Sequence, residues 1–158
     1  KNLLITGTKH LTRHTEFNMR VQVARMGVET IQGYQHVVAS DNYINFMDIS
    51  DNECTEILAN DILDCFSVEK IAECLQLLAS KLRLGGSLVV GGKDVRLFSK
   101  AVINGQVKEQ EASQLVNSVN SMTSVGTVVQ FINSLGLNVA STQIAGMHFE
   151  VKATRERK

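Results

Sequence analysis

The pattern of apolar and polar positions is clearest between residues 56 and 92. Apolar side chains over 68–82 repeat at intervals of three and four, which predicts a helix with one broad apolar face. Ser67 is suited to cap this helix, and Gly85-Gly86 follow its last turn. The flanking runs, 55–59 and 87–91, are short and apolar, as buried strands are. Two strands joined by one helix predict a parallel β–α–β unit with a right-handed crossover.

The N-terminal part has a weaker pattern. Asn2-Leu-Leu-Ile-Thr6 is a short apolar run that ends at Gly7, which predicts a first buried strand over residues 2–6. The stretch that follows allows two interpretations. Apolar residues between 21 and 26 can share one side of a helix, whereas residues 18–24 alternate as a strand does.

The remaining elements follow from shorter patterns. Tyr34–Ala39 and Tyr43–Ile49 are β-prone runs separated by a turn. After Asp94, the spacing of apolar residues predicts three helices, over residues 97–103, over residues 109–119 and after Ser124. The chain then alternates at period two over residues 137–142 and 147–153, with Gly146 between them, which predicts a closing β-hairpin.

Together these elements predict a single α/β domain over residues 1–158. Strands that alternate with helices indicate a doubly wound, mostly parallel sheet, and the final hairpin adds an antiparallel end. Ligands of such sheets bind at the carboxyl ends of the strands, near the point where the strand order reverses. The positions that follow the predicted strands are Gly7, Thr8, Asp41, Asp48, Asn60, Asp61 and residues 91–94.

Composition and charge narrow the class of partner. The 158 residues have no net charge and no concentrated stripe of Lys and Arg, which disfavours nucleic acid as a partner. No stretch approaches the roughly 18 apolar residues of a membrane helix. Residues 41–80 hold nine acidic residues against Lys70 alone, so polyanions are also disfavoured there. We therefore expect a small-molecule substrate.

Three cysteines occur at positions 54, 65 and 74. Their number and spacing suit neither a disulfide framework nor a zinc site. An odd count of cysteines without a recognisable export signal indicates reduced thiols, so we expect a cytoplasmic location and no metal.

Several motifs carry a resemblance to a known family. Asp51-Asn-Glu-Cys-Thr-Glu-Ile-Leu-Ala-Asn-Asp-Ile-Leu-Asp-Cys-Phe66 resembles the fourth-strand motif of class I S-adenosylmethionine-dependent methyltransferases. Leu82-Arg-Leu-Gly-Gly-Ser-Leu-Val-Val90 is similar to their Leu-Lys-Pro-Gly-Gly-Arg-Leu-Val-Ile, and 131–139 resembles their last helix and the strand after it. The final hairpin is also typical of that family. The resemblance covers residues 40–158 and implies a Rossmann-like methyltransferase fold.

The resemblance implies S-adenosylmethionine as the cofactor. In the family, a glycine-rich loop after the first strand lets the backbone approach the cofactor's amino-acid part. Here that place holds a single glycine followed by bulkier residues. The acid that binds the ribose falls at Val38, with Asp41 as the nearest substitute, while Asp48 matches the acid near the adenine. The positions implied for the cofactor are Thr6, Gly7, Thr8, Asp41, Asp48, Ile49, Asn60 and Asp61.

Methyl transfer is a direct displacement, in which the protein aligns the reactants and excludes water. It needs no fixed triad, and it needs a general base only when the acceptor must lose a proton. The positions that suit a base are Asp61, Asp94 and His148.

Three interpretations remain open. The first is a small methyltransferase, and the second is an inactive methyltransferase-like domain that serves as a binding or assembly module, which the degenerate glycine loop favours. The third is a nicotinamide-dependent enzyme, which requires further glycines after Gly7 and a Tyr-x-x-x-Lys pair that the chain lacks. An exposed edge hairpin also allows the domain to pair with itself as a homodimer.

Overall fold

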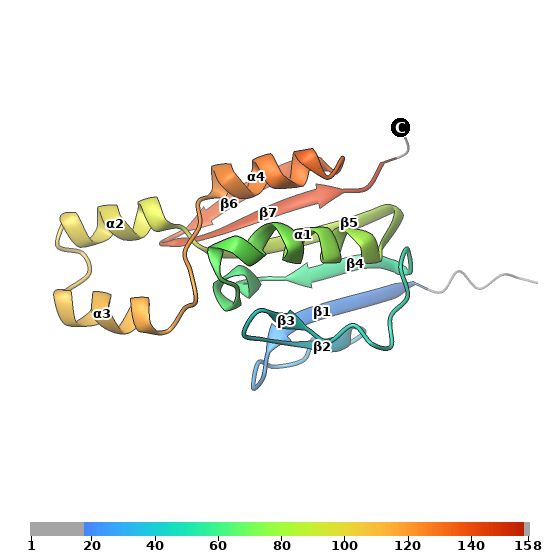
Figure 1. Ribbon diagram of the computed structural model, residues 1–158, viewed down its shortest axis with the longest axis horizontal. Coiled ribbons are helices and arrows are strands. Elements are labelled where there is room, and N and C mark those ends of the chain that lie inside the picture. Colours follow the sequence, from blue (N-terminus) through green and yellow to red (C-terminus); the bar gives the residue numbers. More distant parts are fainter. Residues whose placement is uncertain (1–17, 157–158) are drawn as a thin grey trace, which may run out of the picture.

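Seven strands form one sheet in the order β3-β2-β1-β4-β5-β7-β6 (Figure 1). The computed structural model describes residues 18–156. The strands are β1 (Met19–Arg25), β2 (Gln35–Ser40), β3 (Tyr43–Ile44), β4 (Cys54–Ala59), β5 (Leu82–Lys93), β6 (Asn138–Ala145) and β7 (His148–Thr154). Strands β2, β1, β4 and β5 are parallel neighbours, and β7 runs antiparallel to both β5 and β6. The predicted fold class, a mostly parallel sheet that ends in an antiparallel hairpin, is confirmed.

The helices are α1 (Ile71–Lys81), α2 (Val95–Ile103), α3 (Glu109–Asn117) and α4 (Val125–Ser134), with short 3-10 turns η1 (Ile62–Cys65) and η2 (Val68–Lys70) before α1. Helices α1 and α4 contact each other and bury Leu75, Leu78, Val128 and Ile132 in one core against the same face of the sheet. Helices α2 and α3 extend beyond the carboxyl ends of the parallel strands (Figure 1). No helix within residues 18–156 has the length and apolar character needed to cross a membrane.

The predicted strand–helix–strand unit is confirmed as β4, α1 and β5, with corrections at both junctions. At the first, α1 begins at Ile71 after η2, and the Ser67 side chain makes no capping hydrogen bond. Gly85 and Gly86 lie inside β5 and do not follow the helix, which ends at Lys81. Gly85 has a φ of 79°, and a Cβ on Gly86 would lie 2.9 Å from the Cys54 carbonyl oxygen. The register of β5 against β4 shifts at this place. The two glycines therefore allow an irregular start of β5 that other residues would obstruct.

Strand β1 lies between β2 and β4 near the centre of the sheet. The run Asn2–Thr6 lies outside the described residues, and β1 uses the alternating stretch near residues 18–24. Val21 and Val23 are buried toward α1, and Gln22 lies on the opposite face. Residues 26–34 then connect β1 to its parallel neighbour β2 without a helix. The Gln22 side chain fixes this connection, since Nε2 donates to the Glu29 carbonyl (3.0 Å) and Oε1 accepts from Ile31 N (2.8 Å).

The second β-prone run forms less structure than expected. Only Tyr43–Ile44 pairs with β2, in the antiparallel direction, so β3 is a two-residue hairpin arm. The chain then returns toward the start of β4, where Lys81 Nζ donates to the Ile49 carbonyl (3.0 Å). Because Lys81 directly precedes β5, this contact places Ile49 near the amino ends of the parallel strands.

The C-terminal half agrees with the predicted elements. The three helices after Asp94 are confirmed, as is the hairpin around Gly146. The buried carboxylate of Asp94 accepts hydrogen bonds from Arg96 N (2.8 Å) and Leu97 N (3.1 Å) at the start of α2, and from Val125 N (2.9 Å) in α4. Asp94 also forms an isolated parallel β-bridge with Thr123. The chain therefore leaves the sheet and returns to it at adjacent points.

Candidate functional site

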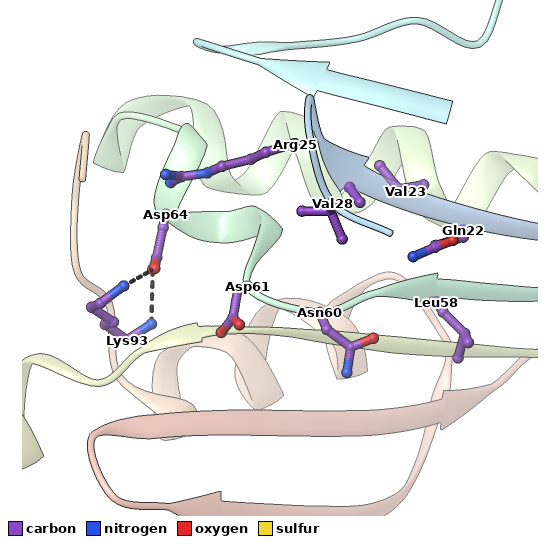
Figure 2. Close-up of a pocket in the computed structure, with 10 residues that line it drawn as sticks. Gln22, Val23, Arg25, Val28, Leu58, Asn60, Asp61, Asp64 and Lys93 are labelled. Atoms are coloured by element: carbon purple, nitrogen blue, oxygen red, sulfur yellow. Dashed lines mark hydrogen bonds and ion pairs between the residues drawn. The ribbon is translucent and has the colours of Figure 1, made fainter. Parts of the chain in front are cut away.

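A cavity of about 310 Å³ opens at the carboxyl ends of the central strands (Figure 2). It lies beside β1 and β4, where the strand order reverses, and open parallel sheets bind their ligands at that point. Its volume is at the lower end of the range for small-molecule sites, which is roughly 300–1,000 Å³. The cavity is lined by Gln22, Val23, Ala24, Arg25, Val28, Leu58, Asn60, Asp61, Asp64 and Lys93.

The end of β4 supplies two polar side chains, Asn60 and Asp61. Asp61 adopts a left-handed backbone conformation (φ 56°), which turns the chain from the strand into η1. Asn60 Nδ2 donates to the Glu150 carboxylate, and Asp61 Oδ1 lies 2.8 Å from His148 Nδ1. Both contacts run to β7, so the closing hairpin fixes the carboxyl end of β4.

A buried ion pair forms one wall of the cavity. The Asp64 side chain is only 3% exposed, and its two oxygens accept from Lys93 N (2.8 Å) and Lys93 Nζ (2.9 Å). A Cβ on Gly92 would lie 2.8 Å from Asp64 Oδ1, so glycine is required there for the carboxylate to reach the backbone of β5. The pair places opposite charges at fixed positions in the wall.

Arg25, the last residue of β1, extends across the cavity toward the Asp64 side chain (Figure 2). Its Nε donates to Cys65 Sγ (2.9 Å). Burial raises the pKa of the Cys65 thiol, and the contact with Arg25 opposes this only in part, so the sulfur is an uncharged acceptor. In the turn that follows, Gly27 has a φ of 87°, and no other glycine lies between residues 18 and 32.

The structure brings together only part of the expected cofactor positions. Asn60 and Asp61 line the cavity. Asp41 lies at the same end of the sheet, where Asn120 Nδ2 donates to it (3.3 Å) and to the Cys65 carbonyl (2.7 Å). Thr6, Gly7 and Thr8 lie outside the described residues.

Asp48 and Ile49 do not line this cavity, because β3 is short and the chain has already turned back toward the amino end of β4. Asp48 was expected to match a third-strand acid near the adenine, but the strand before it is a two-residue strand antiparallel to β2.

The three positions suited to a base differ in their surroundings. The Asp94 carboxylate is occupied by three backbone N–H groups, whereas Asp61 and His148 contact each other in partly exposed positions. Sequence patterns selected Lys93, within the stretch 91–94, but they missed Arg25 and Asp64, which also line the cavity. The sequence did contain a signal for Asp64, because an acidic residue between the apolar Leu63 and Cys65 needs a partner such as Lys93.

Comparison with known proteins supports the fold. No protein-family model matches the chain, and no curated protein matches it in sequence. A methyltransferase from Archaeoglobus fulgidus superimposes with a TM-score of 0.54 at 9% identity, over 88% of this chain and 87% of its own. An O-methyltransferase family protein from Burkholderia thailandensis gives 0.54 at 15% identity, over 78% of this chain.

A geranyl diphosphate C-methyltransferase from Streptomyces coelicolor, solved with S-adenosyl-L-homocysteine, gives a TM-score of 0.50 at 11% identity over 77% of this chain. The chain spans 36% of the Burkholderia protein and 54% of the Streptomyces protein. The sheet is thus similar to those of solved S-adenosylmethionine-dependent methyltransferases, and at these identities the likeness concerns the fold.

Proposed function

We propose that this chain is an S-adenosylmethionine-dependent methyltransferase that acts on a small-molecule acceptor. The proposal rests on one observation above all. In a sheet that superimposes on solved methyltransferases, a cavity lies where the strand order reverses, at the carboxyl ends of β1 and β4.

The chemistry of the cavity suits the polar groups of the cofactor. Arg25 offers guanidinium N–H groups to a carboxylate, as the amino-acid part of the cofactor requires. Asn60 and Asp61 offer oxygen acceptors to its amino and hydroxyl groups. When bound, the cofactor supplies a methyl group activated by a positively charged sulfur. The residues of the chain then need only to align the acceptor and exclude water.

Two observations favour the second interpretation, a binding or assembly module without catalysis. Strand β1 leads into Arg25-Met26-Gly27, which provides one glycine where the family has several. Val38, half-buried in β2, takes the place of an acid that binds ribose hydroxyls. Both departures lie beside the cavity, so they bear directly on the affinity for the cofactor.

Calorimetric titration with S-adenosylhomocysteine separates the two interpretations. We expect wild-type protein to bind in the micromolar range and Arg25→Ala to bind at least tenfold more weakly, which is about 1.4 kcal/mol. Arg96→Ala, which removes an arginine outside the cavity lining, is the matched control and should bind as wild type does. Both variants are first checked for native unfolding temperatures. Absence of binding at millimolar ligand would refute the methyltransferase and support the module.

We further propose a homodimer that forms through β6. This strand lies at the edge of the sheet, contains no charged residue and is exposed along nearly its whole length. No strand within residues 18–156 pairs with its outer side. An uncharged edge of this kind is suited to antiparallel pairing with a second copy.

Analytical ultracentrifugation tests the dimer. We expect wild-type protein to sediment as a dimer and Thr142→Lys, at the middle of β6, to sediment as a monomer, since lysine on an edge strand opposes pairing. Gln110→Lys on the exposed side of α3 adds the same charge elsewhere and should leave the dimer intact. A wild-type monomer at high concentration would rule out this interface.

A cytoplasmic location is also proposed. Cys54, Cys65 and Cys74 are all free thiols buried in the structure. Free thiols persist where the surroundings are reducing.

A further inference from the structure

A second cavity, of about 230 Å³, lies beside the first. Its lining includes Gln143 from β6 and both His148 and Glu150 from β7. Asp61 lines both cavities, so the end of β4 stands between them. Its volume is below the range of roughly 300–1,000 Å³ for drug-sized ligands, so it suits only a smaller molecule, and Asp61, Gln143, His148 and Glu150 make much of its lining polar.

Asp61 and His148 form a hydrogen-bonded pair at this junction. Asp61 Oδ1 lies 2.8 Å from His148 Nδ1, and the two side chains are 58% and 42% exposed. A carboxylate only accepts hydrogen bonds, so Nδ1 carries the proton that is shared with Asp61. In a neutral imidazole with Nδ1 protonated, Nε2 holds a free lone pair. The pair is therefore arranged to accept a proton at His148 Nε2.

The charged groups near His148 on the neighbouring strands already have partners of their own. Lys93 is its partner in β5, and Lys93 Nζ is held by the Asp64 carboxylate. Ala145 is its uncharged partner in β6. Glu150 lies two residues along β7 and accepts from Asn60. Among residues 18–156, the lining of the second cavity thus presents two carboxylates and no Lys or Arg, which disfavours an anionic acceptor.

We propose that the second cavity is the acceptor site of the methyltransferase, that the acceptor is a small uncharged or cationic molecule with a reactive O–H or N–H group, and that the Asp61–His148 pair is the general base. This inference rests on the proposed function. The acceptor's proton passes to His148 Nε2, and the acceptor oxygen or nitrogen forms a bond to the methyl carbon. The bond from that carbon to the cofactor sulfur breaks, and its electron pair remains on the sulfur. His148 then releases the proton to solvent.

Nuclear magnetic resonance of the full chain labelled with 15N-histidine tests the base directly. We expect the His148 ring to carry its proton on Nδ1 in wild-type protein. In Asp61→Ala, the proton should move to Nε2, because the acceptor that fixed the tautomer is gone. His36→Gln removes a histidine from β2 and should leave the His148 tautomer unchanged. A proton on Nε2 in wild-type protein would overturn the assignment of His148 as the base.

Three probes test the acceptor site: ethanolamine, propylamine and catechol, each added at millimolar concentration with S-adenosylhomocysteine present. At least one should shift the His148 ring signals, while acetate should not. With S-adenosylmethionine, transfer of a labelled methyl group to that probe should fall at least 100-fold in His148→Gln, within the range of general-base catalysis (roughly 10²–10⁴-fold). His148→Gln should still bind S-adenosylhomocysteine.

The outcomes separate this inference from the proposed function. If S-adenosylhomocysteine binds and no probe shifts His148, the acceptor site is refuted and the cofactor site stands. If probes shift His148 but S-adenosylhomocysteine does not bind, the proposed methyltransferase is refuted and the second cavity stands as a binding site. Equal transfer rates in wild-type protein and His148→Gln would refute the base.

Discussion

Replacement of Asp64 by alanine is expected to lower the free energy of unfolding by about 3–5 kcal/mol, the usual cost of breaking a buried ion pair. The change leaves Lys93 Nζ, whose side chain is 15% exposed, without its partner, and it also removes the acceptor of Lys93 N. Urea denaturation followed by circular dichroism measures the loss as a lower midpoint with an unchanged slope.

A matched control for this variant is Glu73→Ala. It breaks the Lys70–Glu73 pair, whose side chains are 50% and 69% exposed, so the expected change is within about 0.5 kcal/mol. The double variant Asp64→Leu/Lys93→Met removes both charges and should recover much of the loss, because no buried charge is then left unpaired. A cost below 1 kcal/mol for Asp64→Ala would contradict the burial and pairing described for this wall.

The second large effect is expected at Gly91, where β5 meets β7. A Cβ on this residue would lie 2.2 Å from the Phe149 carbonyl oxygen, and backbone atoms of two paired strands cannot move apart cheaply. Gly91→Ala should therefore lower the free energy of unfolding by about 3 kcal/mol or more, at the upper end for overpacked sites.

The same exchange elsewhere should act in the opposite direction. Gly126 lies exposed in the first turn of α4, and a Cβ there would meet no atom within 4 Å. Gly126→Ala should raise the free energy of unfolding by roughly 0.5 kcal/mol, because alanine favours the helix and loses less chain entropy. Equal effects of the two exchanges in chemical denaturation would show that the close approach at Gly91 is not a constraint.

Local patterns predicted the part of the fold that depends on local physics. The three- and four-residue spacing over α1 and the alternation around Gly146 both report contacts between near neighbours in the chain, and both elements are confirmed. The helix predicted after Ser124 does begin there, and the Ser124 side chain caps it by accepting from Thr127 N. These signals are strong because helices and hairpins are stabilised within a few residues.

The position of β1 and the path after β3 could not be predicted in the same way. Gln22 is buried within a strand, and only its hydrogen bonds to Glu29 and Ile31 make that burial tolerable. The run Tyr43–Ile49 was expected to be one strand, whereas only Tyr43–Ile44 pairs with β2 and the chain turns back before Asp48. Both features depend on how segments return to the sheet, and side-chain periodicity does not report this.

The candidate site was predicted by position and missed in detail for a related reason. The rule that ligands bind after the strands selected Asn60 and Asp61 without any structure. The partners that give these residues their chemistry, such as His148 for Asp61, lie 87 positions away in the chain. Contacts between residues so far apart in the chain can be predicted only when the order of the strands is known.

The chain leaves the sheet at the end of β5 and returns beside the same point. This arrangement determines which part of the sequence can change most easily. Residues 95–122, with α2 and α3, form an excursion whose two ends are held together by Asp94, which bridges Thr123, and by the hydrogen bond from Val95 N to the Thr123 carbonyl (2.7 Å). A segment whose ends meet can change in length or sequence without a change in the sheet beneath it. The contacts of Asn120 with Asp41 and the Cys65 carbonyl lie near the second end of the excursion, so α2 and α3 form the part that can be exchanged beside the candidate site while the core stays the same.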